Sequence, residues 1–409
     1  MKLTIHRGAR EIGGSCVQIT SGNCSILLDA GSPLADSPTD VDLGKIDFSD
    51  LFISHPHQDH FGLIESVGSD KTVHIGETAR RLIETTRIFI DKPPLVNYFS
   101  PLHNRTWVEL RPGFRVMPYL MDHSCVDAFG FLVEADGRRV YYSGDFRAHG
   151  RRRQAFEWFL NDPPRDIDLL LMEGTMMGRD NAAYADEDAV GHGMLEVLRR
   201  HEDMACFLIC SGQHIDRLCD AYWACKQAGR IFVIDIYTAC ILDVVASRFP
   251  SIPGIRTAKN IRVLTKGLTA RAHYEKVARN RGHFGASVRD IFRSETSIGL
   301  DDILKEPHRY FLKISNFSDL LTKLRQCGVI YSMWSGYLDD PKYRKIRQHP
   351  NVSFYEIHTS GHAVRDDLRR FAAGLKPKRL VPVHTERAAD YGAVFDNVII
   401  LQDGEELVL

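Results

Sequence analysis

The chain has 409 residues, of which 44% are hydrophobic and 26% are charged. These proportions are ordinary for a globular protein with a sizeable core, and they exclude a disordered, collagen-like or coiled-coil chain. The 52 Lys and Arg residues almost balance the 53 Asp and Glu residues. The field of the whole molecule is therefore weak, and a polyanionic partner would have to be held by a local basic patch.

Nine cysteines are scattered along the chain without a CxxC pair, which is typical of buried, apolar thiols in a reducing compartment. The N-terminal residues have the pattern of a strand and lack the apolar core of a signal peptide. No run approaches the ~20 apolar residues that a membrane-spanning helix needs. We therefore expect a cytoplasmic protein without a membrane partner.

The first 180 residues alternate short strands with Gly-rich turns. Ser21-Gly22-Asn23 is a good hairpin turn, and the spacing of apolar residues predicts a helix at 78–89. Strands are predicted at 16–20, 25–28, 51–54, 115–120, 129–134, 139–143 and 167–172.

The pattern changes after about residue 180, where strands and helices alternate as in a parallel α/β unit. Helices are predicted at 186–200, 215–228 and 239–246, and strands at 205–210 and 231–236. The last sixty residues return to the earlier style, with strands at 352–357, 379–383, 398–401 and 406–409 and a helix at 364–373. We therefore predict an α/β fold in which a host domain, residues 1–180 and 351–409, is interrupted by an inserted α/β domain, residues 181–350.

The strongest chemical motif is HxHxDH, which runs from His55 to His60 directly after a predicted strand. His55 and His57 are two residues apart in extended backbone, so their rings can project to one side and share a metal ion. Asp59 and His60 are adjacent and can reach a second ion instead. Imidazole and carboxylate ligands without a thiolate suit a catalytic zinc site, with manganese as the alternative. Chance enrichment of a helix start in histidine is the competing interpretation.

Further ligands must come from elsewhere in the chain, and three candidates stand in small polar turns after strands. These are His123, His384 and Asp145, the last preceded by Gly144, which allows close approach of the backbone. Each would be interpreted as an ordinary loop or core residue if the HxHxDH motif were absent.

The order of these residues, with Asp29 in Leu27-Leu28-Asp29-Ala30-Gly31, resembles the metallo-β-lactamase superfamily. The resemblance implies an αββα sandwich and two zinc ions per chain. The implied ligand sets are His55, His57 and His123 for one ion, and Asp59, His60 and His384 for the other. Asp145 would bridge the ions and Asp29 would orient a ligand. Asp122, beside His123, would be a solvated neighbour.

Two further segments narrow this resemblance. Glu173 follows a predicted buried strand, and His358-Thr359-Ser360-Gly361-His362 precedes a predicted helix whose N-terminus could receive an anion. With His384, these residues resemble the β-CASP nucleases, above all the ribonuclease J family. The resemblance implies that the insert is a β-CASP domain, with a channel for single-stranded nucleic acid between the two domains.

The resemblance also implies roles in phosphodiester hydrolysis, in which two zinc ions activate water and clamp the scissile phosphate. His362 would protonate the leaving 3′-oxygen, and Glu173 would hold its ring. The predicted catalytic residues are Asp59, Glu173 and His362. Ser360 and Gly361 would grip phosphate oxygens, and His358 would contact phosphate or be structural. Without the zinc motif, His362 would be interpreted as a neighbour of a helix N-cap.

One segment departs from the ribonuclease J pattern. Ser211 and His214 match residues that contact a 5′-phosphate, but Ile215 stands where an arginine is expected. Arg217 would substitute for it, whereas His214 would equally serve as a helix-start residue. Recognition of a 5′-monophosphate therefore stays open. The chain also ends soon after His384, without the C-terminal assembly domain of ribonuclease J, so a homo-oligomer stays open as well.

A basic run supports a nucleic-acid partner, with RNA favoured over DNA. Only Glu275 and Asp290 oppose its ten basic residues, which are Arg256, Lys259, Arg262, Lys266, Arg271, Lys276, Arg279, Arg281, Arg289 and Arg293. A second run comprises Arg147 and residues 151–153. A solvated face is the competing interpretation of such runs.

The sequence thus predicts a zinc-dependent nuclease that acts on single-stranded RNA. The alternatives are a hydrolase of a small ester, thioester or lactone on the same host fold, and a non-catalytic β-CASP scaffold. The sequence leaves the choice between exonuclease and endonuclease action open.

Overall fold

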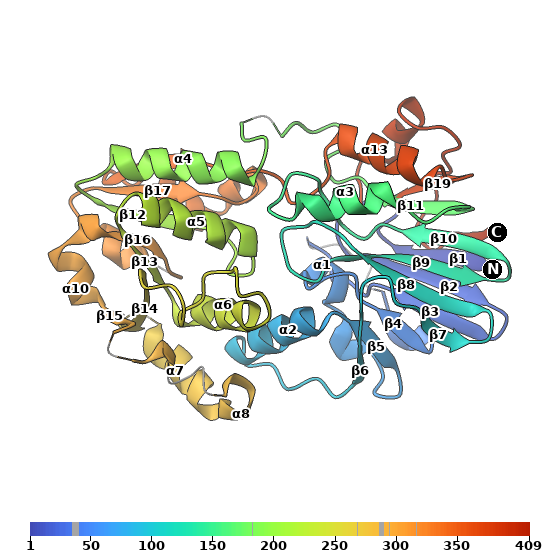
Figure 1. The fold of residues 1–409 in the computed structure, drawn as a ribbon, viewed down its shortest axis with the longest axis horizontal. Helices are drawn as coiled ribbons and strands as arrows, with labels where there is room; N and C mark the ends of the chain where they lie inside the picture. The colour runs from blue at the N-terminus through green and yellow to red at the C-terminus, as the bar shows by residue number, and fades with distance from the viewer. Residues whose placement is uncertain (35–40, 182, 268, 286–289, 294, 316) are drawn as a thin grey trace. The chain divides into compact units, whose positions relative to one another are not determined.

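A computed structural model describes residues 1–34, 41–181, 183–267, 269–285, 290–293, 295–315 and 317–409. The chain divides into two compact units (Figure 1). The host unit comprises Met1–Arg80, Leu95–Asn181 and Gly361–Leu409. The insert unit comprises Arg81–Pro94 and Ala182–Ser360. No helix in these described ranges combines the length and apolar character needed to cross a membrane.

Two sheets form the centre of the host unit. The first has the order β20-β1-β2-β3-β4-β5-β6, with β1 Lys2–Arg7, β2 Cys16–Ser21, β3 Cys24–Leu28, β4 Asp50–Phe52, β5 Thr72–Ile75, β6 Tyr98–Pro101 and β20 Glu406–Val408. The second has the order β19-β11-β10-β9-β8-β7, with β7 Val108–Arg111, β8 Phe114–Leu120, β9 Phe129–Ala135, β10 Arg138–Tyr142, β11 Leu169–Glu173 and β19 Leu380–Val383. The helices with residues in this unit are α1 Gln58–Phe61, α2 Glu77–Phe89, α3 Arg153–Asn161 and α13 Arg365–Leu375.

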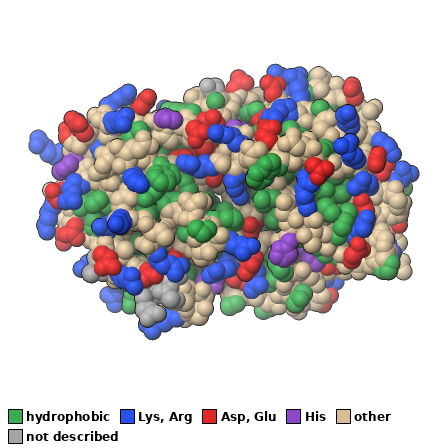
Figure 2. All heavy atoms as spheres, in the orientation of Figure 1, with side chains coloured by type: hydrophobic (Ala, Val, Ile, Leu, Met, Phe, Trp, Pro, Cys, Tyr) green, Lys and Arg blue, Asp and Glu red, His purple; other side chains and the backbone are tan. Residues whose placement is uncertain are grey.

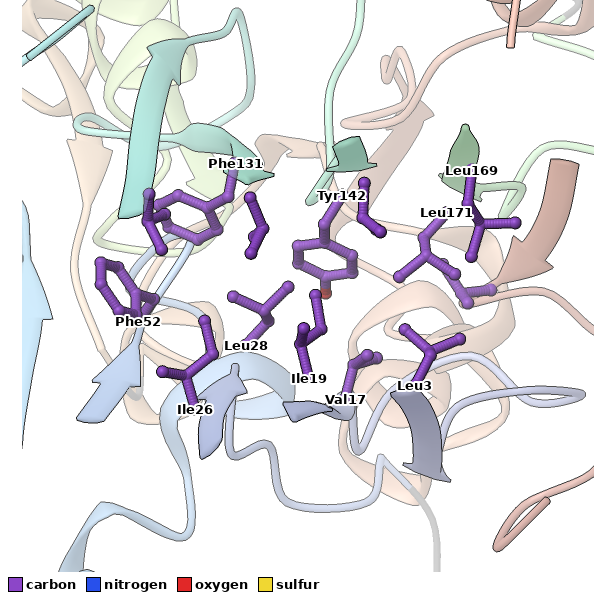
Figure 3. Packing of buried hydrophobic residues seen from close by; sticks show 14 of the residues in the cluster. Leu3, Val17, Ile19, Ile26, Leu28, Phe52, Phe131, Tyr142, Leu169 and Leu171 are labelled. Carbon is purple, nitrogen blue, oxygen red and sulfur yellow. The ribbon is translucent and has the colours of Figure 1, made fainter. Parts of the chain in front are cut away.

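The hydrophobic core of the host unit lies between its two sheets. Figure 3 shows Leu28 and Phe52 of the first sheet facing Phe131 and Leu171 of the second. Side chains alternate along β11, so Leu171 enters this core whereas Leu170 joins a second cluster with Phe159 of α3 and Phe371 of α13. Helices therefore cover the outer face of the second sheet. This arrangement confirms the predicted α/β class and is consistent with an αββα sandwich.

The insert unit is built on a seven-stranded parallel sheet of order β15-β14-β13-β16-β12-β17-β18. Its strands are β12 Ala205–Ile209, β13 Ile231–Ile234, β14 Ile261–Lys266, β15 Ser297–Gly299, β16 Tyr310–Lys313, β17 Cys327–Tyr331 and β18 Val352–Glu356. Its helices are α4 Glu187–Arg200, α5 Ile215–Gln227, α6 Ile236–Arg248, α7 Ala270–Arg279, α8 Arg281–Phe284, α10 Leu300–Lys305, α11 Ser318–Leu321 and α12 Pro341–Arg347. The central strands are apolar without alternation because helices bury both faces of a parallel sheet.

Two expected elements differ from the structure near the C-terminus. We expected the strand at 352–357 to belong to the host, but β18 pairs in parallel with β17 of the insert sheet. The strand expected at 398–401 is reduced to a single bridge between Val398 and Leu380. Both segments are short and apolar, and the partner of such a segment is set by tertiary packing, which its own sequence does not encode.

Candidate metal centre

The HxHxDH motif lies where β4 leaves the first sheet of the host unit. His57 has extended backbone (φ −94°, ψ 146°) and stands directly before α1. His55 and His57 therefore project to the same side, while Asp59 and His60 lie on the helical turn. His55 and His60 are fully buried, so the chain places two imidazoles where they have no access to bulk water.

One group of ligand atoms is formed by His55, His57 and His123. Nδ1 of His57 lies 3.0 Å from Nε2 of His55 and 3.2 Å from Nε2 of His123. Two nitrogen ligands of a tetrahedral zinc ion, each at 2.0–2.1 Å, would stand ~3.3 Å apart. Burial lowers the pKa of all three rings, that of His57 to about 4. The rings are therefore neutral and offer lone pairs.

A second group is formed by Asp59, His60 and His384, whose ligand atoms lie within 4.8 Å of one another. Nδ1 of His384 lies 2.9 Å from Oγ of Ser15. Its buried Nε2 has no hydrogen-bond partner among the described residues and lies 3.6 Å from Oδ2 of Asp59. A buried nitrogen that faces a carboxylate without bonding to it fits a site that receives a cation.

Asp145 lies between the two groups. Its Oδ2 is 3.7 Å from Nε2 of His55, 3.1 Å from Nε2 of His60 and 3.7 Å from Nε2 of His384. Burial alone would raise the pKa of this carboxyl, but His384 and His60 hold it well below its usual range. Asp145 is therefore an anion that touches both ligand groups. The seven predicted ligands are all in the host unit, and nitrogen and carboxylate donors of this kind fit divalent metal ions.

Asp29 fixes the orientation of the second group. Its Oδ2 accepts a hydrogen bond from Nδ1 of His60 at 2.7 Å, which directs Nε2 of that ring toward Asp145. The hydroxyls of Ser54 and Tyr142 also donate to this oxygen, at 2.7 and 2.8 Å. Ser54 and Tyr142 were not predicted, because a serine within the motif and a tyrosine at a strand end carry no signal in one sequence.

Glu173 and His362 lie beside Asp145. Oε1 of Glu173 accepts a hydrogen bond from the backbone N–H of Ala363 at 3.2 Å and lies 3.5 Å from Nδ1 of His362. Burial opposes protonation of the ring, but Glu173 and Asp145 outweigh it and raise the pKa of His362 to about 9. The His362 side chain is 21% exposed whereas Glu173 is 1% exposed. Of this pair, the imidazole is therefore the group that can meet a substrate.

The residues predicted to bind phosphate are divided between the two units. Gly361 belongs to the host unit, and a Cβ at this position would lie 3.3 Å from Oγ of Ser124. Ser211 is exposed, and its Oγ accepts a hydrogen bond from the N–H of Gln213. Ser360 is buried. His214 precedes α5 and accepts a hydrogen bond from the N–H of Arg217, which is the helix-start alternative.

Arg217 differs most from its predicted role. Its side chain is fully buried, and Nε and Nη2 bind the two carboxylate oxygens of Glu187 at 3.1 and 3.2 Å. Nη1 binds Ser332, at its carbonyl oxygen and its hydroxyl, and Nδ1 of His358, while Nη2 also donates to the carbonyl of Thr359. A guanidinium with its donors engaged in this way positions the His358–Thr359 segment, and these contacts do not favour direct phosphate binding.

Two other expectations at the centre need correction. Asp122 is not solvated: it is fully buried and accepts a hydrogen bond from the N–H of Gly150 at 2.8 Å. Arg147 of the second basic run is also fully buried, with Nε 3.9 Å from Asp122. We also expected the cysteines to be buried, apolar thiols, and Cys125 is buried but lies in a group of possible metal ligands with His55, His57 and His123.

Pairing with acids weakens the long basic run of the insert. Arg289 lies outside the described residues. Among those that are described, Arg256 pairs with Asp243 at 2.9 Å, and Lys276 pairs with Asp91 at 2.6 Å. Figure 2 shows Lys and Arg side chains interspersed with Asp and Glu over the visible face. The count of basic residues therefore overstates the charge that a polyanion would meet.

Two family models match this chain. The model described as the metallo-beta-lactamase superfamily matches residues 9–183, which contain six of the seven predicted ligands. The model described as the Zn-dependent metallo-hydrolase RNA specificity domain matches residues 351–393, which contain His362 and His384.

Curated relatives and a solved structure agree with these models. Ribonuclease J of Mycoplasma genitalium is 18% identical over 387 residues, which are 88% of this chain and 63% of the relative. The RNase J-like protein of Methanocaldococcus jannaschii is 25% identical over 185 residues, 42% of each chain. Integrator complex subunit 11 of Danio rerio is 25% identical over 206 residues, 43% of this chain and 34% of the relative. A protein of unknown function from Enterococcus faecalis V583 shares the fold, with a TM-score of 0.78, 18% identity and coverage of 100% and 99% of the two chains.

The chain spans less than two thirds of the length of each of these curated relatives. The predicted ligands nevertheless gather in overlapping groups, and six of the seven lie in the region that the superfamily model matches. Residues 9–183 match the metallo-β-lactamase superfamily, and the chain is similar to the β-CASP, ribonuclease J-like group within it.

Proposed function

We propose that this chain is a zinc-dependent nuclease that hydrolyses phosphodiester bonds of single-stranded RNA. The observation that carries the proposal is the position of Asp145, whose carboxylate touches both ligand groups while His362 stands 3.6 Å away. Two ligand groups joined by one carboxylate suit a pair of divalent ions. Their imidazole-rich donor set favours zinc, with manganese as the alternative.

Two zinc ions bound to these groups would supply Lewis acidity and lower the pKa of a water molecule at the site. His55, His57 and His123 would hold one ion, Asp59, His60 and His384 would hold the other, and Asp145 would bridge them. The buried, oriented rings hold this geometry before substrate arrives, so little reorganisation is needed during the reaction.

The chain's own proton donor would be His362. Water would lose a proton to solvent and its oxygen would form a new bond to phosphorus, the bond from phosphorus to the 3′-oxygen would break, and His362 would give its proton to that leaving oxygen. The products are a 5′-phosphate and a 3′-hydroxyl. Glu173 would keep the ring protonated and correctly directed, because its other oxygen is fixed by the N–H of Thr175 at 2.9 Å.

The test is cleavage of labelled single-stranded RNA by the purified full chain supplied with zinc or manganese. We expect products from the wild-type protein, none from His55→Ala or Asp145→Ala, and a loss of about 10²–10⁴-fold for His362→Ala. The exposed His103, which lies in the host unit outside the ligand groups, supplies the control His103→Ala, which should retain full activity.

Two results would contradict the proposal. If metal-loaded wild-type protein leaves RNA and single-stranded DNA intact, the chain is not a nuclease of this kind. If it hydrolyses small esters or thioesters and His362→Ala retains that turnover, the alternative hydrolase is correct.

A further inference from the structure

Cys125 lies next to the first ligand group of the host unit. It is two residues beyond His123, in the loop that follows β8, and its side chain is fully buried. Its Sγ and the ligand nitrogens of His55, His57 and His123 all lie within 4.8 Å of one another. The thiol therefore faces three imidazoles, an environment very different from an apolar core.

The three imidazoles themselves indicate a cation at this point. Nδ1 of His57 is within 3.0 Å of one imidazole nitrogen and 3.2 Å of another. A neutral ring nitrogen either donates one hydrogen bond or accepts through one lone pair, so three converging nitrogens cannot all be satisfied by one another. A shared positive ion would satisfy all three.

The backbone around Cys125 is fixed. Nη2 of Arg152 donates to the carbonyl oxygens of both His123 and Cys125, and the first of these bonds is 3.0 Å long. These two bonds fix the backbone of His123 and of Cys125 relative to each other.

We propose that Cys125 is a further protein ligand, in addition to the bridging Asp145, of the ion held by His55, His57 and His123. This inference rests on the metal centre of the proposed function. When the sulfur–metal bond forms, the thiol loses its proton to solvent, and the thiolate binds. Nitrogen and sulfur ligands on tetrahedral zinc stand ~3.6 Å apart, so binding draws Sγ inward from the present limit of 4.8 Å.

A thiolate ligand would determine which metal this position selects. Soft sulfur ligands favour zinc, cobalt and cadmium over magnesium and manganese, which prefer oxygen. It would also occupy a coordination position that the three histidines and the bridging Asp145 do not fill. Cys125 would thus make the first position selective for zinc, whereas Asp59, His60 and His384 supply only nitrogen and oxygen to the second.

The experiment is absorption spectroscopy of the full chain loaded with Co²⁺ in place of zinc. A thiolate bound to Co²⁺ gives a charge-transfer band in the near ultraviolet, whereas nitrogen and oxygen ligands give only the weaker visible bands. We expect the ultraviolet band in wild-type protein and its loss in Cys125→Ser and Cys125→Ala. Cys16 is also buried in the host unit but is in none of the ligand groups found among the described residues, so Cys16→Ala should keep the band.

Competition titration with a chelator gives a second readout. Loss of a partner outside the coordination shell already costs about 10–100-fold in metal affinity, so loss of a ligand should cost on the order of tenfold or more. Cys125→Ser should lower zinc affinity by at least that factor and change manganese affinity much less. Circular dichroism of each variant separates these effects from unfolding, and Cys125→Ala serves if the serine variant does not fold.

The possible outcomes separate this inference from the proposed function. Visible Co²⁺ bands without the ultraviolet band in wild-type protein, or an ultraviolet band that persists in both Cys125 variants, would overturn the role of Cys125 alone. Absence of every Co²⁺ band would overturn the metal centre and this inference with it. A Cys125-dependent band in a protein that leaves RNA intact would support the ligand and reject the nuclease.

Discussion

Two residues at the metal centre have a backbone conformation that residues other than glycine rarely adopt. Asp29 has φ of 61° and His384 has φ of 53°. Left-handed backbone costs a non-glycine residue on the order of 1 kcal/mol or more, and it persists where neighbouring structure fixes it. Here the N–H of Asp29 donates to the carbonyl of Phe52 at 2.8 Å, and that of His384 donates to the carbonyl of Gly8 at 2.7 Å. The strained residues therefore lie directly after two strands, where their side chains enter the metal centre.

The first prediction concerns Asp29, which holds the His60 ring. Asp29→Asn removes a carboxylate oxygen that accepts from Nδ1 of His60 at 2.7 Å. The ring loses its fixed orientation, so we expect metal affinity at the group of Asp59, His60 and His384 to fall about 10–100-fold. Zinc titration against a competing chelator measures this change.

A matched control is Asp50→Asn in the same unit. Asp50 makes the same kind of contact, at 2.7 Å to Nε2 of His74, but neither residue belongs to a ligand group in the described part of the chain. This variant should bind zinc like the wild type. Equal losses of zinc affinity in the two variants would show that Asp29 affects metal binding only through the stability of the fold.

The sequence predicted the ligands better than their surroundings. His123, Asp145 and His384 follow β8, β10 and β19 of the second sheet, whereas HxHxDH follows β4 of the first. Their position after strands is visible in the sequence, but their meeting depends on how the two sheets pack. Asp122 and Arg217 were misinterpreted because charge on a side chain says nothing about whether folding buries it with a partner. Cys125 was missed because a lone cysteine carries no spacing signal.

At the scale of elements, Arg217 joins four segments of the insert unit. It lies on α5, pairs with Glu187 at the start of α4, and also contacts Ser332 after β17 and the segment that follows β18. A buried ion pair contributes little more to stability than an apolar pair would, but removing one partner leaves the other charge buried without that partner, which is destabilising. The pair therefore specifies how these segments meet.

The second prediction follows from this pairing. Arg217→Met should lower the free energy of unfolding of the insert unit by about 3–5 kcal/mol, because Glu187 stays buried and loses its guanidinium partner. The double variant Glu187→Met, Arg217→Met should recover much of that loss. Urea unfolding, with hydrogen exchange of the α5 amides as the probe, measures the free energy of unfolding of both variants.

Arg271→Met is the matched control for this prediction. Arg271 also pairs with a glutamate, Glu275, but its side chain is 92% exposed, so its removal should have little effect on unfolding. If Arg217→Met proves as mild as Arg271→Met, the Arg217 network is not what holds the segment.

The third prediction concerns pH and the start of α6. Asp235 is buried and accepts from the N–H of Thr238 at 2.7 Å and from the N–H and hydroxyl of Ser315 at 2.9 and 2.7 Å. Burial opposes its ionisation, but Lys313, 3.9 Å away, and the N–H of Thr238 hold its pKa below the ordinary value. Its charge therefore contributes stability that is complete at neutral pH and is lost as pH falls below about 4, through the lowered folded pKa.

Asp235→Asn tests this assignment. The variant should be less stable than the wild type at pH 7, and the difference should shrink as the pH is lowered toward 3, as measured by urea unfolding at each pH. Asp340 caps α12 and accepts a hydrogen bond from the N–H of Lys342 at 2.7 Å. Asp340→Asn should lower the free energy of unfolding at pH 7 by less than Asp235→Asn does. A stability difference for Asp235→Asn that is constant from pH 7 to 3 would contradict a role for the charge.

Some helices and strands were predicted closely and others were missed. The helices at 186–200 and 215–228 correspond closely to α4 and α5. The helix α3 was not predicted, because Arg151, Arg152 and its own first residue Arg153 were interpreted as a basic run. The partner of β18 was misjudged because one apolar strand can join either sheet, and only long-range packing decides between them.

At the scale of the whole molecule, the two units carry different parts of the predicted chemistry. All seven predicted metal ligands, Glu173 and His362 belong to the host unit, whereas His358, Ser360, Ser211, His214 and Arg217 belong to the insert unit. Anything that binds only the folded host unit stabilises that unit by mass action. Metal binding and insert stability should therefore be separable by experiment.

The fourth prediction uses this separation. Zinc at about 100 times its dissociation constant adds about 2.7 kcal/mol to the stability of the fold that binds it, which slows amide exchange through unfolding of that fold about 100-fold. Hydrogen exchange measured by mass spectrometry should show this slowing in host peptides such as β4, β10 and β19, and little change in β12 and β17 of the insert. Asp145→Ala should abolish the slowing, because both ligand groups lose their shared carboxylate. Equal protection of β12 and β4 by zinc would show that the two units unfold as one, and that the host unit does not bind metal as an independent fold.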